Sequence, residues 1–125
     1  MGFLTIDGFE KLSKQQLFDM SVAHIGATRQ KCTDNSGACM YQGIGCAAAP
    51  FLQETLRRRA DGLGSWNFLA ERLAVPEHEV DFITNMQRCH DNADNDEFMK
   101  SWSEAMRRLA QVNGVSTEKL DAIKL

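Results

Sequence analysis

The spacing of apolar residues predicts a long helix near the start of the chain. Ser13 followed by Gln16 has the spacing of a capping box, in which each residue satisfies a backbone N–H of the other. Apolar side chains then recur at intervals of three and four residues: Leu17, Phe18, Val22 and Ile25. A helix is therefore expected from about Lys14 to about Arg29.

The middle of the chain predicts three further helices. The first begins near Cys46, because three alanines favour a helix and Pro50 is tolerated only in a first turn; it ends at Asp61 and Gly62. A short one follows over residues 65–73. Another starts at Pro76 and continues to residue 91, with Phe82, Ile83, Met86, Cys89 and His90 on its apolar side.

The last third of the chain has the most regular apolar pattern. Five residues follow intervals of four, three, four and three, which predicts a helix that buries this stripe: Phe98, Trp102, Ala105, Leu109 and Val112. Gly114 ends the helix, and Ser116 is placed to cap one more short helix.

Turn-forming residues interrupt the helices once. Asp34 to Gly37 lie between two stretches that tolerate a strand, which predicts a hairpin with Cys32 opposite Cys39 and their thiols in reach of each other. The expected fold class is mainly α, or α+β. It is a compact bundle of about five or six helices with one small β-hairpin after the first helix, and residues 1–125 are expected to form a single globular domain.

Charge and composition narrow the function classes. The net charge of −3 and the pI of about 5.6 argue against a protein whose main task is to bind nucleic acid, since such a protein needs a clustered basic surface. The chain shows no apolar run long enough to cross a membrane and no signal peptide. Four cysteines without such a signal are typical of free thiols in a reducing cytoplasm. No cofactor is expected.

Cys46 and His90 are the candidate catalytic pair. A cysteine at the start of a helix lies near unpaired N–H groups, which lower its pKa, and a histidine could serve as its base. Asp91 follows His90 directly, and neighbours on a helix point about 100° apart, so Asp91 is a poor partner for orienting the imidazole. The alternative is a Cys46 that is only a small buried residue.

Two other sites remain open. A structural zinc site could use Cys32, Cys39, Cys46 and His90, with Cys89 as a substitute for His90, although the six-residue gaps lack the usual short chelating pairs. A recognition surface could instead use Tyr41, Gln42 and the hairpin tip. Tyr41 could equally be a residue that fixes the hairpin onto the helices. His24 is interpreted as a partly buried histidine bonded to a backbone carbonyl.

The stretches "CMYQGIGCAAA" and "MQRCHD" resemble a group of small bacteriophage and prophage proteins with the pattern Cys-x-Tyr-Arg-Gly, Cys-Ala-Val-Gly and Leu-Gln-x-x-His-Asp. The matching residues are Cys39, Tyr41, Gly43, Cys46, Ala47, Gln87, His90 and Asp91. Gln42 replaces the arginine of that pattern, Ala48 and Ala49 replace valine and glycine, and Met86 replaces leucine.

The resemblance implies a small accessory protein in the cytoplasm of a bacterial host cell. Such a protein would act without catalysis by binding a host protein, such as one related to defence, a phage protein or a small ligand. Its candidate binding residues are Cys39, Tyr41, Gln42 and Asp91. A thiol-dependent hydrolase or transferase using Cys46 and His90 is the alternative, and a structural zinc-binding module is the second alternative.

Overall fold

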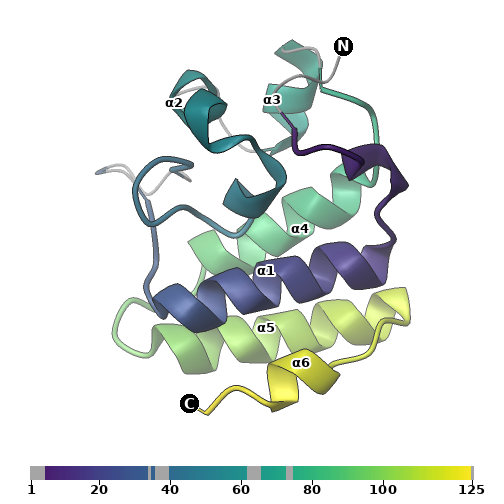
Figure 1. The fold of residues 1–125 in the computed structure, drawn as a ribbon. Helices are drawn as coiled ribbons and strands as arrows, with labels where there is room; N and C mark the ends of the chain where they lie inside the picture. The colour runs from purple at the N-terminus through teal and green to yellow at the C-terminus, as the bar shows by residue number, and fades with distance from the viewer. Residues whose placement is uncertain (1–4, 34, 36–39, 62–65, 73–74, 125) are drawn as a thin grey trace.

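Three long helices form the body of the protein in a computed structural model that describes residues 5–33, 35, 40–61, 66–72 and 75–124. They are α1 (Lys14–Thr28), α4 (Val80–Asp91) and α5 (Phe98–Asn113). Figure 1 shows them side by side, with α5 running opposite to α1 and α4. The short helices are α2 (Arg57–Ala60), α3 (Trp66–Arg72) and α6 (Glu118–Asp121), and three single 3₁₀ turns cover residues 9–11, 49–51 and 54–56.

The first helix agrees with its prediction. Ser13 and Gln16 form the complete capping box, and the four predicted apolar residues are all buried. α1 packs against α4 on one side and α6 on another, whereas α3 and α5 both pack against α4. The expected mainly helical fold is therefore confirmed, and none of the helices in the described residues combines the length and apolar character needed to cross a bilayer.

The prediction of one helix from Cys46 to Asp61 is wrong. Pro50 does lie in the first turn of a helical segment, but that turn is 3₁₀ and ends at Phe51. Leu52 is extended and forms an antiparallel bridge with Thr5, and the N–H of Ile6 donates to the carbonyl of Phe51 at 3.1 Å. Pairing with the N-terminal segment therefore outweighs the helix propensity of the alanines.

Two other boundaries differ from the sequence prediction. α4 begins at Val80 and not at Pro76, because Glu79 adopts a left-handed conformation with φ of 48°. The predicted hairpin is not seen in the described residues: Asp34 and residues 36–39 lie outside them, and its two flanks share one backbone bond, from the N–H of Met40 to the carbonyl of Cys32 at 3.2 Å.

α5 buries a different stripe from the predicted one. Phe98 and Trp102 belong to the core, but the core side continues through Met106 and Ala110. The side chain of Val112 is 84% exposed, and Ala105 and Leu109 are only partly buried. Ala105, Leu109 and Val112 therefore lie toward a face of α5 that, among the described helices, only α4 borders.

Candidate functional site

The loop of residues 40–49 brings together most of the candidate residues. Tyr41 is fully buried, and its hydroxyl accepts a hydrogen bond from Nε2 of Gln87 on α4 at 2.6 Å. Oε1 of Gln87 accepts from the backbone N–H of Trp66, the first residue of α3, at 2.5 Å. Gln87 thus joins the loop, α4 and the start of α3, and Tyr41 fixes the loop to the helices with its hydroxyl in the interior.

His90 holds the chain that leaves α1. Its ring is fully buried, and Nε2 accepts a hydrogen bond from the backbone N–H of Cys32 at 2.9 Å. Because Nε2 is an acceptor, Nδ1 carries the proton and donates to Oδ1 of Asp91 at 2.6 Å. The ring also meets Phe98 edge to face at 5.6 Å. Both nitrogens of the imidazole are therefore engaged.

The expectation that Asp91 is a poor partner for orienting His90 is wrong, since Nδ1 of His90 lies 2.6 Å from Oδ1 of Asp91. The angle of about 100° separates the Cα–Cβ bonds of neighbouring residues on a helix. Nδ1 of His90 and the carboxylate oxygens of Asp91 each lie two bonds beyond Cβ, so these atoms can still meet. Adjacent side chains can close that gap at the last residue of a helix. Asp91 fixes the tautomer that leaves Nε2 free of hydrogen, as the Cys32 contact requires.

Cys32 carries a free thiol that holds the other side of the loop. Its sulfur accepts a hydrogen bond from the N–H of Gly45 at 3.2 Å and lies 3.6 Å from the carbonyl oxygen of Gln42. Burial raises the pKa of this thiol, so its neutral form, which can also donate to a carbonyl, is favoured. Cys39, its expected partner, lies outside the described residues.

Cys46 does not fit the role of a thiolate nucleophile. It is fully buried, its sulfur belongs to a disulfide bond, and Nε2 of Gln87 lies 3.9 Å from that sulfur. The expectation that all four cysteines are free thiols is therefore wrong at this position. The helix start that was expected to lower its pKa is also absent, since the nearest helical turn begins at Ala49 and is a single 3₁₀ turn.

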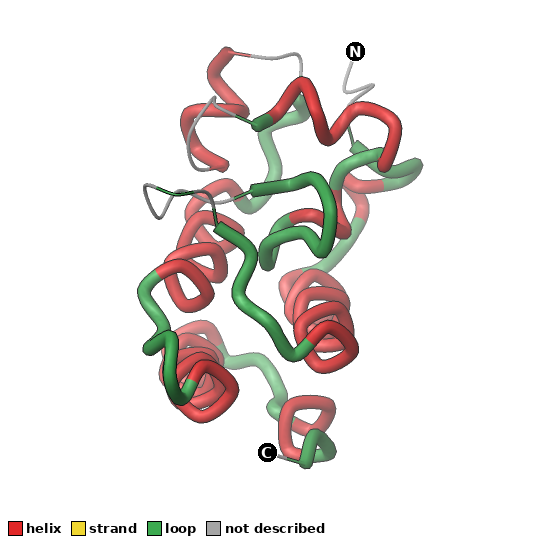
Figure 2. The backbone as a smooth tube through the Cα atoms, turned by 90° about the vertical axis from the view of Figure 1, so that its left-hand side faces the viewer, coloured by secondary structure: helices red, strands yellow, loops and turns green. Residues whose placement is uncertain are grey.

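Gln42 is the exposed member of the group. Its Nε2 donates to Oδ2 of Asp61 at 2.7 Å, and the N–H of Tyr41 donates to Oδ1 of the same carboxylate at 2.6 Å. Asp61 thus receives two adjacent donors of the loop and ties them to the end of α2. In Figure 2 the loop lies above α1 and beside α4.

The zinc arrangement is not formed by the described residues. The lone pair of His90 Nε2, which a metal would need, already accepts the Cys32 N–H, and Cys46 is disulfide-bonded. Among the residues described, no three histidine, cysteine or acidic side chains come close enough to hold a metal ion.

We expect Cys46 to be inert toward alkylation in protein purified without reductant. In urea, iodoacetamide should label Cys32 and Cys89, whereas Cys46 should be labelled only after reduction, as peptide mass spectrometry would show. The thiol-enzyme hypothesis makes the opposite prediction. In reduced, folded protein it requires Cys46 to react faster than an ordinary thiol near pH 7.

His24 joins α1 to the same loop, and its interpretation is confirmed. Nε2 donates to the carbonyl oxygen of Gly45 at 2.9 Å, and nearby Ser21 donates to the carbonyl of Ala47 at 2.9 Å. Burial lowers the pKa of His24 below its usual 6.5, and the positive charge of Arg57 acts in the same direction; the bond to Gly45 opposes them. The folded loop thus favours the neutral imidazole.

The lowered pKa of His24 makes the stability depend on pH. The unfolded chain binds the His24 proton more readily, so this contribution is complete above pH 6.5 and is lost as the pH falls below that value. We expect the urea midpoint to fall less between about pH 7.5 and about pH 5.5 in His24→Gln than in the wild type. Glutamine keeps a donor for Gly45 and cannot titrate, and the other histidines cancel in the comparison. Equal pH slopes would contradict the assignment.

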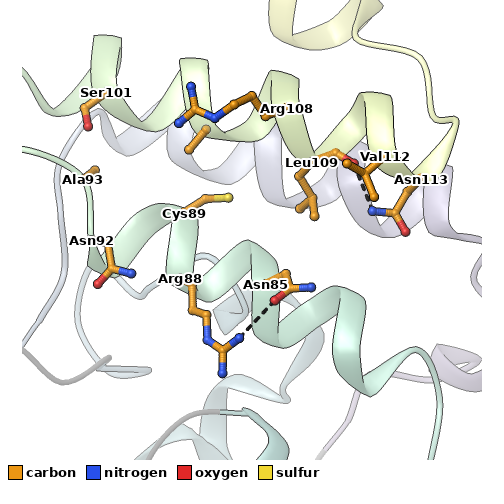
Figure 3. A pocket seen from close by; sticks show the side chains of 11 residues that line it. Asn85, Arg88, Cys89, Asn92, Ala93, Ser101, Arg108, Leu109, Val112 and Asn113 are labelled. Atoms are coloured by element: carbon orange, nitrogen blue, oxygen red, sulfur yellow. Dashed lines mark hydrogen bonds between the residues drawn. The ribbon is translucent and has the colours of Figure 1, made fainter.

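A groove between α4 and α5 is a second candidate site, which the sequence patterns did not reveal. It has a volume of about 610 Å³. Figure 3 shows the sulfur of Cys89 and the side chain of Leu109 pointing into the space between the two helices. Burial raises the pKa of Cys89 to about 11, although the positive charge of Arg108 partly opposes this shift. The thiol is therefore protonated at neutral pH and contributes polarisable surface to the groove.

The groove is positively charged at its rim. Arg88 and Arg108 line it from opposite helices and are both exposed, and none of the described residues that line it is acidic. Amide and hydroxyl groups supply further hydrogen-bonding partners along its length: Asn85, Asn92, Ser101 and Asn113. A spacing of three and four residues along each helix explains why these side chains share one face.

Comparisons with protein-family models, with curated proteins and with solved structures found no match to this chain. The geometry of its own residues is therefore the basis for a functional assignment.

Proposed function

We propose that the protein is a small phage-type accessory protein that acts without catalysis, in the cytoplasm of a bacterial host cell, by binding a host protein. One observation carries this proposal. The residues that are candidates for reactivity hold the 40–49 loop in place. Tyr41 and Cys46 contact Gln87, and His90 accepts a hydrogen bond from the backbone N–H of Cys32. What remains for function is the exposed surface.

The phage setting is supported by the motif residues and by their shared environment. Tyr41, Cys46, Gln87 and His90 all belong to the part of the chain that resembles the phage proteins, and all four are buried. These four residues stabilise the interior of the protein. Their role is compatible with a binding module that contacts its partner through its outer surface.

Binding of a protein is favoured over a small ligand by the form of the groove. Its lining extends along α5 from Ser101 to Asn113 and faces solvent, which suits an extended partner surface better than a compact molecule. Gln87, Tyr41 and Cys46 line none of four cavities of about 440 to 610 Å³ in the described part of the chain.

The test is affinity capture from a bacterial lysate followed by reconstitution. The tagged protein should recover the same host protein in repeated experiments, and the two purified proteins should form a complex in size-exclusion chromatography. The same chain denatured by heat before the experiment should fail to recover it. Recovery of no partner that binds in purified form would contradict the proposed function.

A further inference from the structure

An uncovered apolar stripe lies on one side of α5. Ala105, Leu109 and Val112 share this side, and Val112 is 84% exposed. A stripe at helical spacing gains free energy when it is covered, at roughly 25 cal/mol for each Å² of apolar surface removed from water. Within the described part of the chain, no helix other than α4 borders this side.

Arginines on both sides of the stripe define the charge of whatever covers it. Arg88 on α4 and Arg108 on α5 both line the groove, and neither has an ion-pair partner within 4.0 Å among the described residues. The chain as a whole is acidic, with a net charge of −3, so this pair stands out against the overall charge. Opposite charge on a partner would direct it to the groove and fix its orientation.

The opposite end of α4 provides a contrast. A hollow of about 520 Å³ near its start is lined by four acidic residues, namely Glu71, Glu77, Glu79 and Asp81. An acidic segment would be repelled from that end and attracted to the Arg88 end. The hollow at the start of α4 is therefore lined by carboxylates and the groove by two arginines, so an acidic segment is favoured in the groove.

We propose that the groove between α4 and α5 binds an acidic, amphipathic helical segment of the partner protein. Its apolar side chains would cover Leu109 and Val112, and its carboxylates would pair with Arg88 and Arg108. The lining of α5 from Ser101 to Asn113 extends over about 18 Å, which matches a segment of about 12 residues in three turns. This inference rests on the proposed function and specifies the partner's chemistry.

The experiment is a selection from a library of random peptides of about 14 residues, displayed on ribosomes, against the folded protein. We expect the enriched peptides to carry Asp or Glu together with apolar residues at intervals of three and four. Their binding should shift the side-chain amide resonances of Asn85, Asn92 and Asn113 in nitrogen-15 spectra. Enrichment of basic peptides, shifts confined to another surface, or no enrichment would overturn the inference.

Matched variants test the contacts. Arg88→Glu with Arg108→Glu should weaken the selected peptides about tenfold or more, and Val112→Ser should weaken them by a smaller factor. Arg58→Glu with Arg72→Glu makes the same change of net charge on α2 and α3, and should leave binding unchanged. Thermal melting shows whether each variant is folded. Equal loss in both double variants would indicate a general effect of charge and overturn the inference.

The same variants separate the two proposals. Suppose that the wild type captures a host protein and the Arg88→Glu/Arg108→Glu variant captures it equally well. The proposed function then stands, and the assignment of the groove as the binding site is wrong. Formation of a dimer that covers the groove, measured by ultracentrifugation, would make a second copy of the chain the occupant and would also overturn the inference. If neither host protein nor peptide binds, both proposals fail.

Discussion

Replacement of Gln87 by leucine is expected to lower the free energy of unfolding by about 3 to 5 kcal/mol. The leucine fits the volume but leaves two buried groups without their partner: the hydroxyl of Tyr41 and the N–H of Trp66. A buried polar group that loses its partner costs about 1 to 3 kcal/mol. Trp66 is the first residue of α3, so its N–H has no acceptor within that helix and depends on α4.

Urea denaturation of Gln87→Leu beside Gln111→Leu would measure this effect. Gln111 is exposed on α5, so its replacement should change stability by only about 0.5 kcal/mol or less. Tyr41→Phe should have an intermediate effect, because it removes the hydroxyl but leaves Gln87 bonded to Trp66. A Gln87→Leu variant as stable as Gln111→Leu would show that the buried bonds do not form.

The second large effect is expected at Gly45, where alanine should cost about 2 to 4 kcal/mol. Gly45 has φ of 84°, which strains any residue with a Cβ atom. A Cβ there would lie 2.7 Å from Cβ of Ala49 and 3.3 Å from Nε2 of His24. The clash with buried Ala49 would displace the loop and weaken the bond between His24 and the Gly45 carbonyl.

Gly43→Ala is the control for backbone strain alone. Gly43 has φ of 67°, but a Cβ there meets no atom within 4 Å, so the cost should be only about 1 to 2 kcal/mol. The difference between the two urea midpoints isolates the contact with Ala49 and His24. If both variants lose the same stability, the close packing of the loop against α1 is contradicted.

Local sequence was enough to predict α1 but not the segment after it. The capping box of Ser13 and Gln16 and the apolar stripe lie within one helix, so nearby residues determine the structure. The stretch from Cys46 to Asp61 has comparable helix propensity, yet Leu52 pairs with Thr5, some 47 positions earlier. Propensity is a weak preference, and a contact from a distant segment overrides it.

The residues of the candidate site could be predicted from the sequence better than the hydrogen bonds that join them. His24 was expected to meet a carbonyl and does so. Tyr41 and Gln87 were both recognised as motif residues, but their mutual hydrogen bond depends on how α4 lies against the loop, and spacing alone does not define that. The disulfide bond of Cys46 likewise depends on the path of the loop.

The groove could not be predicted from the sequence, because the spacing of apolar residues on a helix does not indicate which other element covers them. Leu109 and Val112 follow the helical pattern as regularly as Trp102 does, and only the placement of α4 and α1 shows which side of α5 is filled. The same pattern produces a core on one side and an open surface on the other. The exposed arginines added no signal of their own, since charged residues on helices are common.

The bond between Gln87 and Tyr41 has a consequence for chains that share this motif. Because the motif residues lie inside and hold the loop, mutational drift at them is limited by folding, whereas Arg88, Arg108 and Val112 outside are free to vary. Two chains with the same cysteine, tyrosine and histidine pattern would then have the same loop and could recognise unrelated targets. The motif would identify an architecture, and the exposed rim of α4 and α5 would decide the target.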